Sequence, residues 1–149
     1  MIIPDVNLLL YAYDASSAFH SKAAAWWTEC LSGSEPIGLP ALVAFGFVRL
    51  ATHPRVFTAP LTPREAADHV RSWLGQPCLH ILQANAKHVV DVLKLIEEIG
   101  AAGNLVTDTQ LAALAIANEA VLHTSDSDVL RFAGLRWMNP ISGQRSRST

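Results

Sequence analysis

Three aspartates that are far apart in the sequence have the residue type and placement needed to carry out chemistry. Asp5 follows the predicted strand 2–4, Asp126 comes just after the predicted strand 120–124, and Asp108 lies in a segment of helical periodicity. Carboxylates that converge without a cationic partner raise one another's pKa values, and a divalent cation resolves that conflict. Ligands that are all oxygen favour Mg²⁺ or Mn²⁺ over Zn²⁺. Such a site suits hydrolysis of a phosphodiester by a water molecule that the cation activates.

Asp108 is the most informative of the three, because it continues an apolar stripe. On a helix, the positions that share its face hold Leu111, Ala112 and Ala115. No Lys or Arg lies within one helical turn of Asp108 along this segment. A carboxylate in that position must be protonated, paired or bound to a metal.

The other aspartates also have ordinary structural interpretations. Asp5 could be the N-cap of a helix, and Asp126 and Asp128 could form an acidic helix N-terminus that the helix dipole favours. These interpretations stay open beside the metal site.

Polar residues flank the aspartates and could orient them. Asn7, Thr124 and Ser125 are placed for hydrogen bonds to the carboxylates, although Asn7 could equally cap the first helix. Thr124 is the preferred orienting residue, because its hydroxyl stands two positions before Asp126 at the same strand end.

The segments that position these residues alternate between strands and amphipathic helices. Strands are expected over 2–4, 36–39, 78–82, 120–124 and 135–138, and helices over 8–13, 18–31, 41–52, 62–75, 85–100, 104–118 and 125–132. This alternation predicts a parallel sheet covered by helices on both faces. If the first and fourth strands are neighbours, Asp5 and Asp126 emerge side by side at the edge where ligands collect.

Length and composition limit the remaining possibilities. The 149 residues fit one domain, 1–141, followed by a polar segment, 142–149, that we expect to be disordered. With 50% hydrophobic and 16% charged residues, the chain is expected to be globular. It has no apolar run near the roughly 20 residues of a membrane span and no basic leader, so we expect a cytoplasmic protein. The net charge of −2 argues against a protein that coats nucleic acid but not against an enzyme that acts on it.

The order and spacing of these segments resemble those of a PIN domain, in particular a VapC-type toxin of a bacterial toxin–antitoxin pair. The resemblance spans nearly the whole chain and rests on residues 2–12, 107–115, 124–132 and 135–140. It implies a three-layer α/β/α PIN-like fold around a central, mainly parallel five-stranded sheet. It also implies Mg²⁺-dependent endoribonuclease activity on RNA, with Mn²⁺ able to substitute, inhibition by a cognate VapB-type antitoxin, and a homodimer.

Carried over residue by residue, the resemblance assigns catalysis and metal binding to Asp5, Asp108 and Asp126, with Asp128 as a fourth metal ligand. The glutamate that this family usually has on its third helix is missing, because Gly46 stands in its place. A subset of VapC-like sequences shares the glycine, so activity need not be lost with the glutamate.

Arg49 follows Gly46 by nearly one helical turn and would border the crevice. Its guanidinium could hold a phosphate oxygen of RNA at two points. The alternative is a surface arginine whose aliphatic part covers Phe45 and Leu50.

Two other functions are considered. A catalytically degenerate PIN-like module would bind RNA or the antitoxin without turnover, and Gly46 is the residue that favours it. A phosphatase that forms an aspartyl phosphate on Asp5 is disfavoured, because such enzymes carry a second acid two residues later, where this chain has Asn7.

Overall fold

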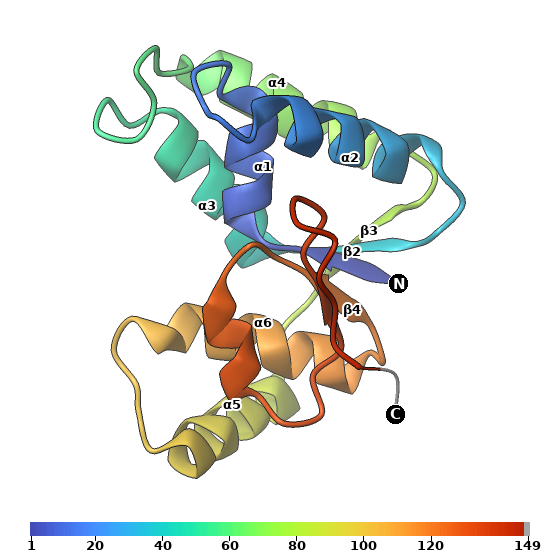
Figure 1. Cartoon of the computed structure of the whole chain (residues 1–149), viewed down its shortest axis with the longest axis vertical. Helices are drawn as coiled ribbons and strands as arrows, with labels where there is room; N and C mark the ends of the chain where they lie inside the picture. Colours follow the sequence, from blue (N-terminus) through green and yellow to red (C-terminus); the bar gives the residue numbers. More distant parts are fainter. Residues whose placement is uncertain (148–149) are drawn as a thin grey trace.

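Five short strands form the centre of the structure, a computed structural model that describes residues 1–147 (Figure 1). In chain order they are β1 (Ile2–Pro4), β2 (Ile37–Pro40), β3 (Leu79–Leu82), β4 (Val121–His123) and β5 (Trp137–Met138). Their order in the sheet is β3-β2-β1-β4-β5, and each neighbouring pair is parallel. The predicted parallel sheet, with the first and fourth strands adjacent, is confirmed.

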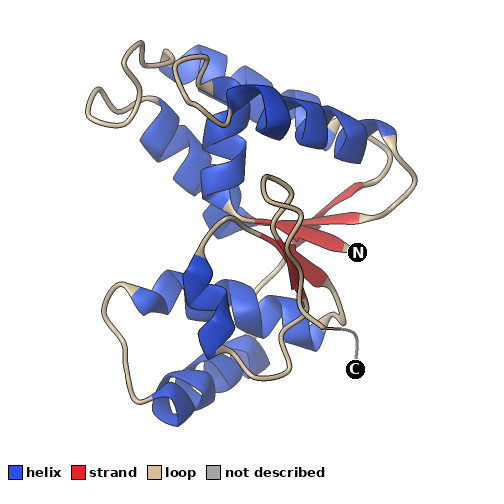
Figure 2. Ribbon diagram, in the orientation of Figure 1, coloured by secondary structure: helices blue, strands red, loops and turns tan. Residues whose placement is uncertain are grey.

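Helices cover both faces of the sheet and give the predicted three layers (Figure 2). One layer holds α1 (Val6–Tyr13), α2 (His20–Ser32), α3 (Ala41–Ala51) and α4 (Pro63–Leu74). The other holds α5 (Ala86–Ile99), α6 (Leu105–Ala117) and the short helix η1 (Ser127–Arg131). The helix expected over 125–132 is therefore a 3-10 helix of five residues. Among residues 1–147, no helix has the length and apolar character that crossing a membrane requires.

Helix α4 begins where its sequence predicts. The Thr62 hydroxyl accepts a hydrogen bond from the Glu65 N–H, and the Glu65 carboxylate accepts one from the Thr62 N–H. This reciprocal pair satisfies two backbone donors that the first helical turn would leave without partners.

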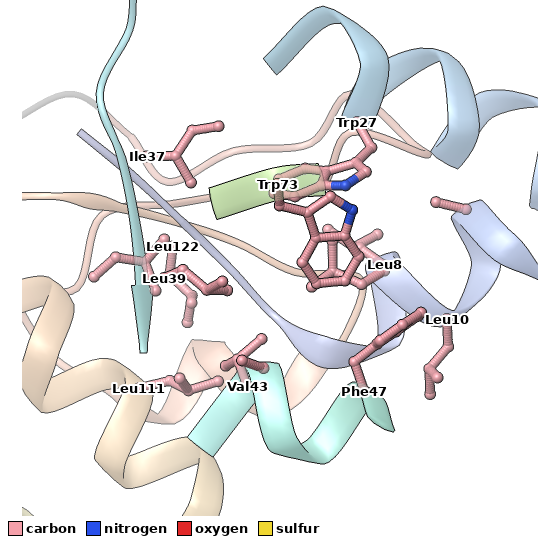
Figure 3. Close-up of a cluster of buried hydrophobic side chains, with 14 of the residues drawn as sticks. Leu8, Leu10, Trp27, Ile37, Leu39, Val43, Phe47, Trp73, Leu111 and Leu122 are labelled. Carbon is pink, nitrogen blue, oxygen red and sulfur yellow. The ribbon is translucent and has the colours of Figure 1, made fainter. Parts of the chain in front are cut away.

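An aromatic cluster centred on Trp73 joins the first helical layer to the sheet (Figure 3). The Trp73 ring is fully buried and packs edge-on against Phe47 and Trp27, with ring centroids 4.8 Å and 5.4 Å away. Its Nε1 donates a hydrogen bond of 2.7 Å to the Tyr13 hydroxyl, so the indole is buried without an unpaired donor. This cluster fixes α1, which follows β1 directly, against the rest of the layer.

Residues 142–147 return to the sheet, which corrects the expectation of a disordered segment there. The Ser146 N–H donates to the Trp137 carbonyl over 2.9 Å, and Met138 and Arg145 form an antiparallel bridge. Because β5 is an edge strand, its unpaired backbone groups are available to a segment of any composition. The expectation for residues 148 and 149 lies outside the described residues.

Candidate active site

The carboxyl ends of β1 and β4 lie side by side, as predicted. Pro4 is paired with His123, and the Asp5 N–H donates a hydrogen bond of 2.9 Å to the His123 carbonyl. Asp5 therefore leaves β1 at the level where Thr124 leaves β4. Side chains from the two strand ends enter the same space, although 119 residues separate them.

Thr124 connects Asp5 to Asp126. The buried Thr124 hydroxyl lies 2.7 Å from Asp5 Oδ2, to which it donates, and it accepts a hydrogen bond of 3.0 Å from the Asp126 N–H. The hydrogen bond to Asp5 is of the kind expected from the sequence of Thr124, whose role at the site stays a prediction. It ties the first predicted carboxylate to the backbone that carries the third.

Asp126 is both the N-cap of η1 and a member of a group of carboxylates. Its Oδ1 accepts a hydrogen bond of 2.9 Å from the Asp128 N–H. A carboxylate has two oxygens with several lone pairs, so capping and metal binding by Asp126 are compatible. The Asp128 carboxylate accepts a hydrogen bond of 3.1 Å from Nε of Arg131, one turn further on.

Asp108, Asp126 and Asp128 form what we call the acidic cluster. One oxygen from each of these half-buried residues lies within 4.8 Å of the others. Burial, followed by the charges of Asp126, Asp5 and Asp128, raises the pKa of Asp108 from 3.8 to about 6. Asp108 occupies the first turn of α6. The packing of α6 against β4 and η1 brings it to the strand end.

Asp5 lies outside the acidic cluster but next to it. Its side chain is buried, and burial raises its pKa above the ordinary value, with a further contribution from the charge of Asp126. The Thr124 hydroxyl opposes that rise by donating a hydrogen bond to the carboxylate. The Asp5 side chain does not cap the helix that follows it. The four predicted carboxylates therefore share one region, in which burial and the neighbouring negative charges disfavour ionisation of Asp5 and Asp108.

Asn7 and Ser125 lie at the predicted positions near this region. Asn7 is half-buried in the first turn of α1, two residues after Asp5. Ser125 is half-buried between Thr124 and Asp126. Both residues therefore lie close in sequence to the strand ends, whereas the contact with Asp5 is made by Thr124.

A cavity of about 290 Å³ lies beside Asp5, with walls from α3 and α6. Gly46 forms part of the α3 wall, and a Cβ placed on it would lie 3.5 Å from Val6 Cγ2, an ordinary van der Waals distance. The exposed Arg49 lines the same cavity as Asp5, as its spacing from Gly46 predicts. The missing side chain at position 46 leaves this wall open.

Phe45 and Gln110, which the sequence does not mark as site residues, also line this cavity. Phe45 lies in an apolar run that reads as core, yet its side chain is 73% exposed. One signal was available, because Leu42, Phe45, Gly46 and Arg49 follow the i, i+3, i+4, i+7 spacing of a single helix face. Nothing in the sequence marks Gln110 in the same way.

Comparisons with known sequences agree with one another. Residues 2–135 match the family model described as PIN domain. Ribonuclease VapC33 of Mycobacterium tuberculosis is 45% identical over 141 residues, which cover 95% of this chain and 99% of that protein. Ribonuclease VapC37 of the same species is 38% identical over 141 residues, which cover 94% of this chain and 97% of that protein.

Solved structures share the fold. VapC20 of Mycobacterium tuberculosis, described as a toxin that cleaves the Sarcin-Ricin loop, superimposes with a TM-score of 0.69 at 15% identity, covering 91% of this chain and 96% of that one. VapBC2 of Rickettsia felis, solved with a fragment of promoter DNA, gives 0.65 at 19% identity, covering 93% of this chain and 98% of that one. At these identities the likeness establishes the three-layer architecture.

Proposed function

Because the chain belongs to the PIN domain family and, within it, to the VapC ribonucleases, we propose that it cleaves RNA as the toxin of a VapBC-type pair, with Asp5, Asp108 and Asp126 as catalytic residues. The family membership confirms the resemblance that the sequence predicted. We assign the metal, the site residues and the partners by combining this membership with the arrangement of side chains at the ends of β1 and β4.

The side chains at these strand ends fit a hard divalent cation. Each residue of the acidic cluster offers an oxygen within 4.8 Å of the other two. Hydrogen bonds through Thr124 link Asp5 to the backbone of Asp126. An all-carboxylate set favours Mg²⁺, with Mn²⁺ as a substitute, and these four residues would hold it. When bound, the cation lowers the pKa of a water molecule and neutralises charge that develops on the phosphate.

The chain's own residues supply position and charge. Thr124 fixes the Asp5 carboxylate at the strand end, and Asn7 and Ser125 complete the polar surroundings. Arg49, on the wall of the cavity beside Asp5, is placed to pair with a phosphate oxygen of the RNA. Together these residues hold the substrate's backbone over the carboxylates.

The partners follow from the same assignment. We assign a VapB-type antitoxin as the inhibitor, a homodimer as the assembly and the cytoplasm as the location. The similar folds from Rickettsia felis and Haemophilus influenzae were solved as VapBC2 and VapBC-1. An apolar patch on α5, where Val89, Val90 and Leu93 are 55%, 62% and 55% exposed, supports a protein–protein interface.

The observation that carries the proposal is the link from Asp5 through Thr124 to Asp126, next to the acidic cluster. The test is cleavage of structured RNA by the purified protein with Mn²⁺. We expect Asp5→Ala and Asp126→Ala to lower the rate at least about 100-fold. Asp91→Ala is the matched control, because Asp91 pairs with Lys87 on α5 and should leave the rate unchanged. Equal cleavage by the wild type and Asp5→Ala would contradict the proposal.

Gly46 supports a second candidate, a module that binds RNA or the antitoxin without turnover. Calorimetric titration of the antitoxin-free protein with Mn²⁺ separates the two candidates. Measurable binding that is lost in Asp126→Ala supports the enzyme, and its absence from the wild type supports the binding module.

A further inference from the structure

The cavity beside Asp5 has walls of unequal chemistry. Its interior is mostly apolar, with contributions from Val6, Leu42, Val43, Leu50 and Leu111. Phe45 and Gly46 also line it. Four further residues are charged or polar: Asp5 with its carboxylate, the exposed Arg49, Thr107 and Gln110. An apolar space with a few polar groups is typical of a site for a small, flat organic group.

We propose that this cavity receives one unpaired base of the RNA, beside the phosphodiester bond that is cleaved, and thereby selects the cleavage site. The inference rests on the proposed function and adds to it the part of the substrate that is recognised. The base enters between α3 and α6, through the wall that Gly46 leaves open.

A base is a better occupant than a phosphate, because the charge and the apolar lining of the cavity both disfavour an anion. The buried Asp5 carboxylate repels an anion inside the cavity. Most of the lining is apolar, so the polar groups of Thr107 and Gln110 offset little of the cost of removing a phosphate from water. Arg49 is left to contact the backbone. The volume of about 290 Å³ lies near the lower limit, roughly 300 Å³, of ligand pockets, which suits a single base and not a protein helix.

Phe45 supplies a surface on which a base can stack. Its ring is 73% exposed although it is a large apolar side chain, and it lies on the face of α3 that carries Gly46 and Arg49. Exposed aromatic rings and arginine planes are the groups on which proteins stack unpaired RNA bases. Phe45 and Arg49 are four residues apart, so the ring that stacks the base and the guanidinium that contacts the backbone lie on one helix face.

Gln110 can read the edge of the base from the opposite wall. Its Nε2 makes one long hydrogen bond of 3.4 Å to the Val106 carbonyl. An amide carries two donor hydrogens and an acceptor oxygen, so the second hydrogen and the oxygen remain for a ligand. Thr107, one helical turn before, adds a hydroxyl to the same wall.

The proposed occupant must be unpaired. A base that is stacked in a duplex cannot present its edge to a pocket between two helices, whereas bases in loops and single strands can be splayed out. The preferred substrate is therefore a loop or a single-stranded segment, with the recognised base adjacent to the cut.

A binding experiment tests the pocket without cleavage. Short single-stranded RNAs carry a fluorescent adenine analogue, quenched by stacking, at successive positions and are titrated with the wild-type chain in EDTA. We expect quenching at one position, with Phe45→Ala weakening binding roughly 10-fold or more and Phe45→Trp restoring it. Phe19→Ala, which removes an exposed aromatic ring away from this cavity, is the matched control and should bind like the wild type. Equal binding by Phe45→Ala and Phe45→Trp overturns the proposal.

A cleavage experiment separates failure of the pocket from failure of the proposed function. With Mn²⁺, we expect an abasic site at the recognised position to lower the rate at least about 10-fold, and Gly46→Leu, which fills the cavity, to do the same on intact RNA. Phe19→Ala, which alters an exposed ring outside the cavity, is again the control and should cleave at nearly the wild-type rate. Cleavage that is indifferent to every abasic position and to Gly46→Leu overturns the base pocket alone. No cleavage by the wild type overturns the proposed function, while the binding experiment still decides the pocket.

Discussion

The Thr124 hydroxyl donates a hydrogen bond of 2.7 Å to Asp5 Oδ2. Its direction is fixed by the Asp126 N–H, which donates into the same hydroxyl oxygen. A hydroxyl has one hydrogen to give, so that hydrogen goes to the buried carboxylate. Thr124 thereby partly compensates the loss of water around Asp5, and it links two strand ends that carry carboxylates proposed to be catalytic.

Replacement of Thr124 should affect both stability and activity. Thr124→Val keeps the shape but leaves Asp5 without this donor, so we expect a loss of about 1–3 kcal/mol in the free energy of unfolding. We also expect cleavage to fall roughly 10- to 100-fold, because the carboxylate is no longer held. Thr124→Ser keeps the hydroxyl and is the matched control. Urea unfolding and RNA cleavage measure the two effects, and a valine variant as active as the serine variant would show that Thr124 does not position Asp5.

Asp108 should make the metal-free protein less stable as the pH rises. Its pKa is raised from 3.8 to about 6 in the folded chain, so the folded state holds the proton more tightly than the unfolded state. The stability this provides is present below about pH 4 and is lost as the pH rises through about 6. With solvent screening taken into account, Asp108→Asn should be about 1–2 kcal/mol more stable above that range in EDTA. Thermal unfolding across this pH range checks the sign, and an asparagine variant that never exceeds the wild type contradicts it.

Divalent cations should stabilise the folded chain. At a Mn²⁺ concentration of about 100 times Kd, preferential binding to the folded state contributes about 2.7 kcal/mol, or roughly 5–10 °C in Tm. Asp126→Asn should abolish most of this shift, whereas Asp91→Asn on α5 should retain it. Differential scanning calorimetry with and without Mn²⁺ measures the difference. A wild-type Tm that Mn²⁺ leaves unchanged would count against the site.

Position 46 should control cation affinity. Gly46 lines the cavity that contains Asp5, and a side chain there meets Val6 at an ordinary distance. Gly46→Glu adds a carboxylate near those of the strand ends, so we expect Mn²⁺ to bind about 10-fold more tightly. Gly46→Gln has the same size without the charge and isolates the electrostatic effect. Isothermal titration decides, and equal affinities of the two variants would mean that the new carboxylate does not reach the cation.

His123 should give a pH dependence of the opposite sign. Burial lowers its pKa from 6.5 to about 4, and its Nδ1 accepts a hydrogen bond of 3.0 Å from Trp26 Nε1. The stability this neutral ring provides is present above pH 6.5 and is lost as the pH falls through about 4. His123→Gln can keep an acceptor for Trp26 without titrating, so the acid loss of stability should be smaller in that variant. Tm measured against pH tests this, and identical slopes would contradict it.

The adjacency of Asp5 and Thr124 could be predicted from the sequence because it follows from strand order. Two short apolar runs, each followed at once by a polar residue, bring those polar residues to one edge whenever the strands are parallel neighbours. The start of α4 could be predicted for a similar reason, since its signals are local to residues 62–65.

Other features depend on packing that one sequence does not reveal. The distance between Asp108 and Asp128 is set by how α6 lies against β4 and η1. Phe45 has the composition of a core residue, and its exposure depends on which elements cover that face of α3. The order of residues 142–147 comes from backbone hydrogen bonds to an edge strand, for which polar composition carries no signal.

The pairing of β1 with β4 also has a consequence for how the protein is made. Asp5 leaves the ribosome among the first residues, whereas Thr124 and Asp126 follow only when synthesis is nearly finished. At the proposed site, an unfinished nascent chain therefore lacks a complete set of carboxylates, and we expect it not to cleave RNA. The contact between Asp5 and Thr124 joins residues far apart in the sequence, so it is also slow to form. We therefore expect activity to begin only when the polypeptide is almost ready for release.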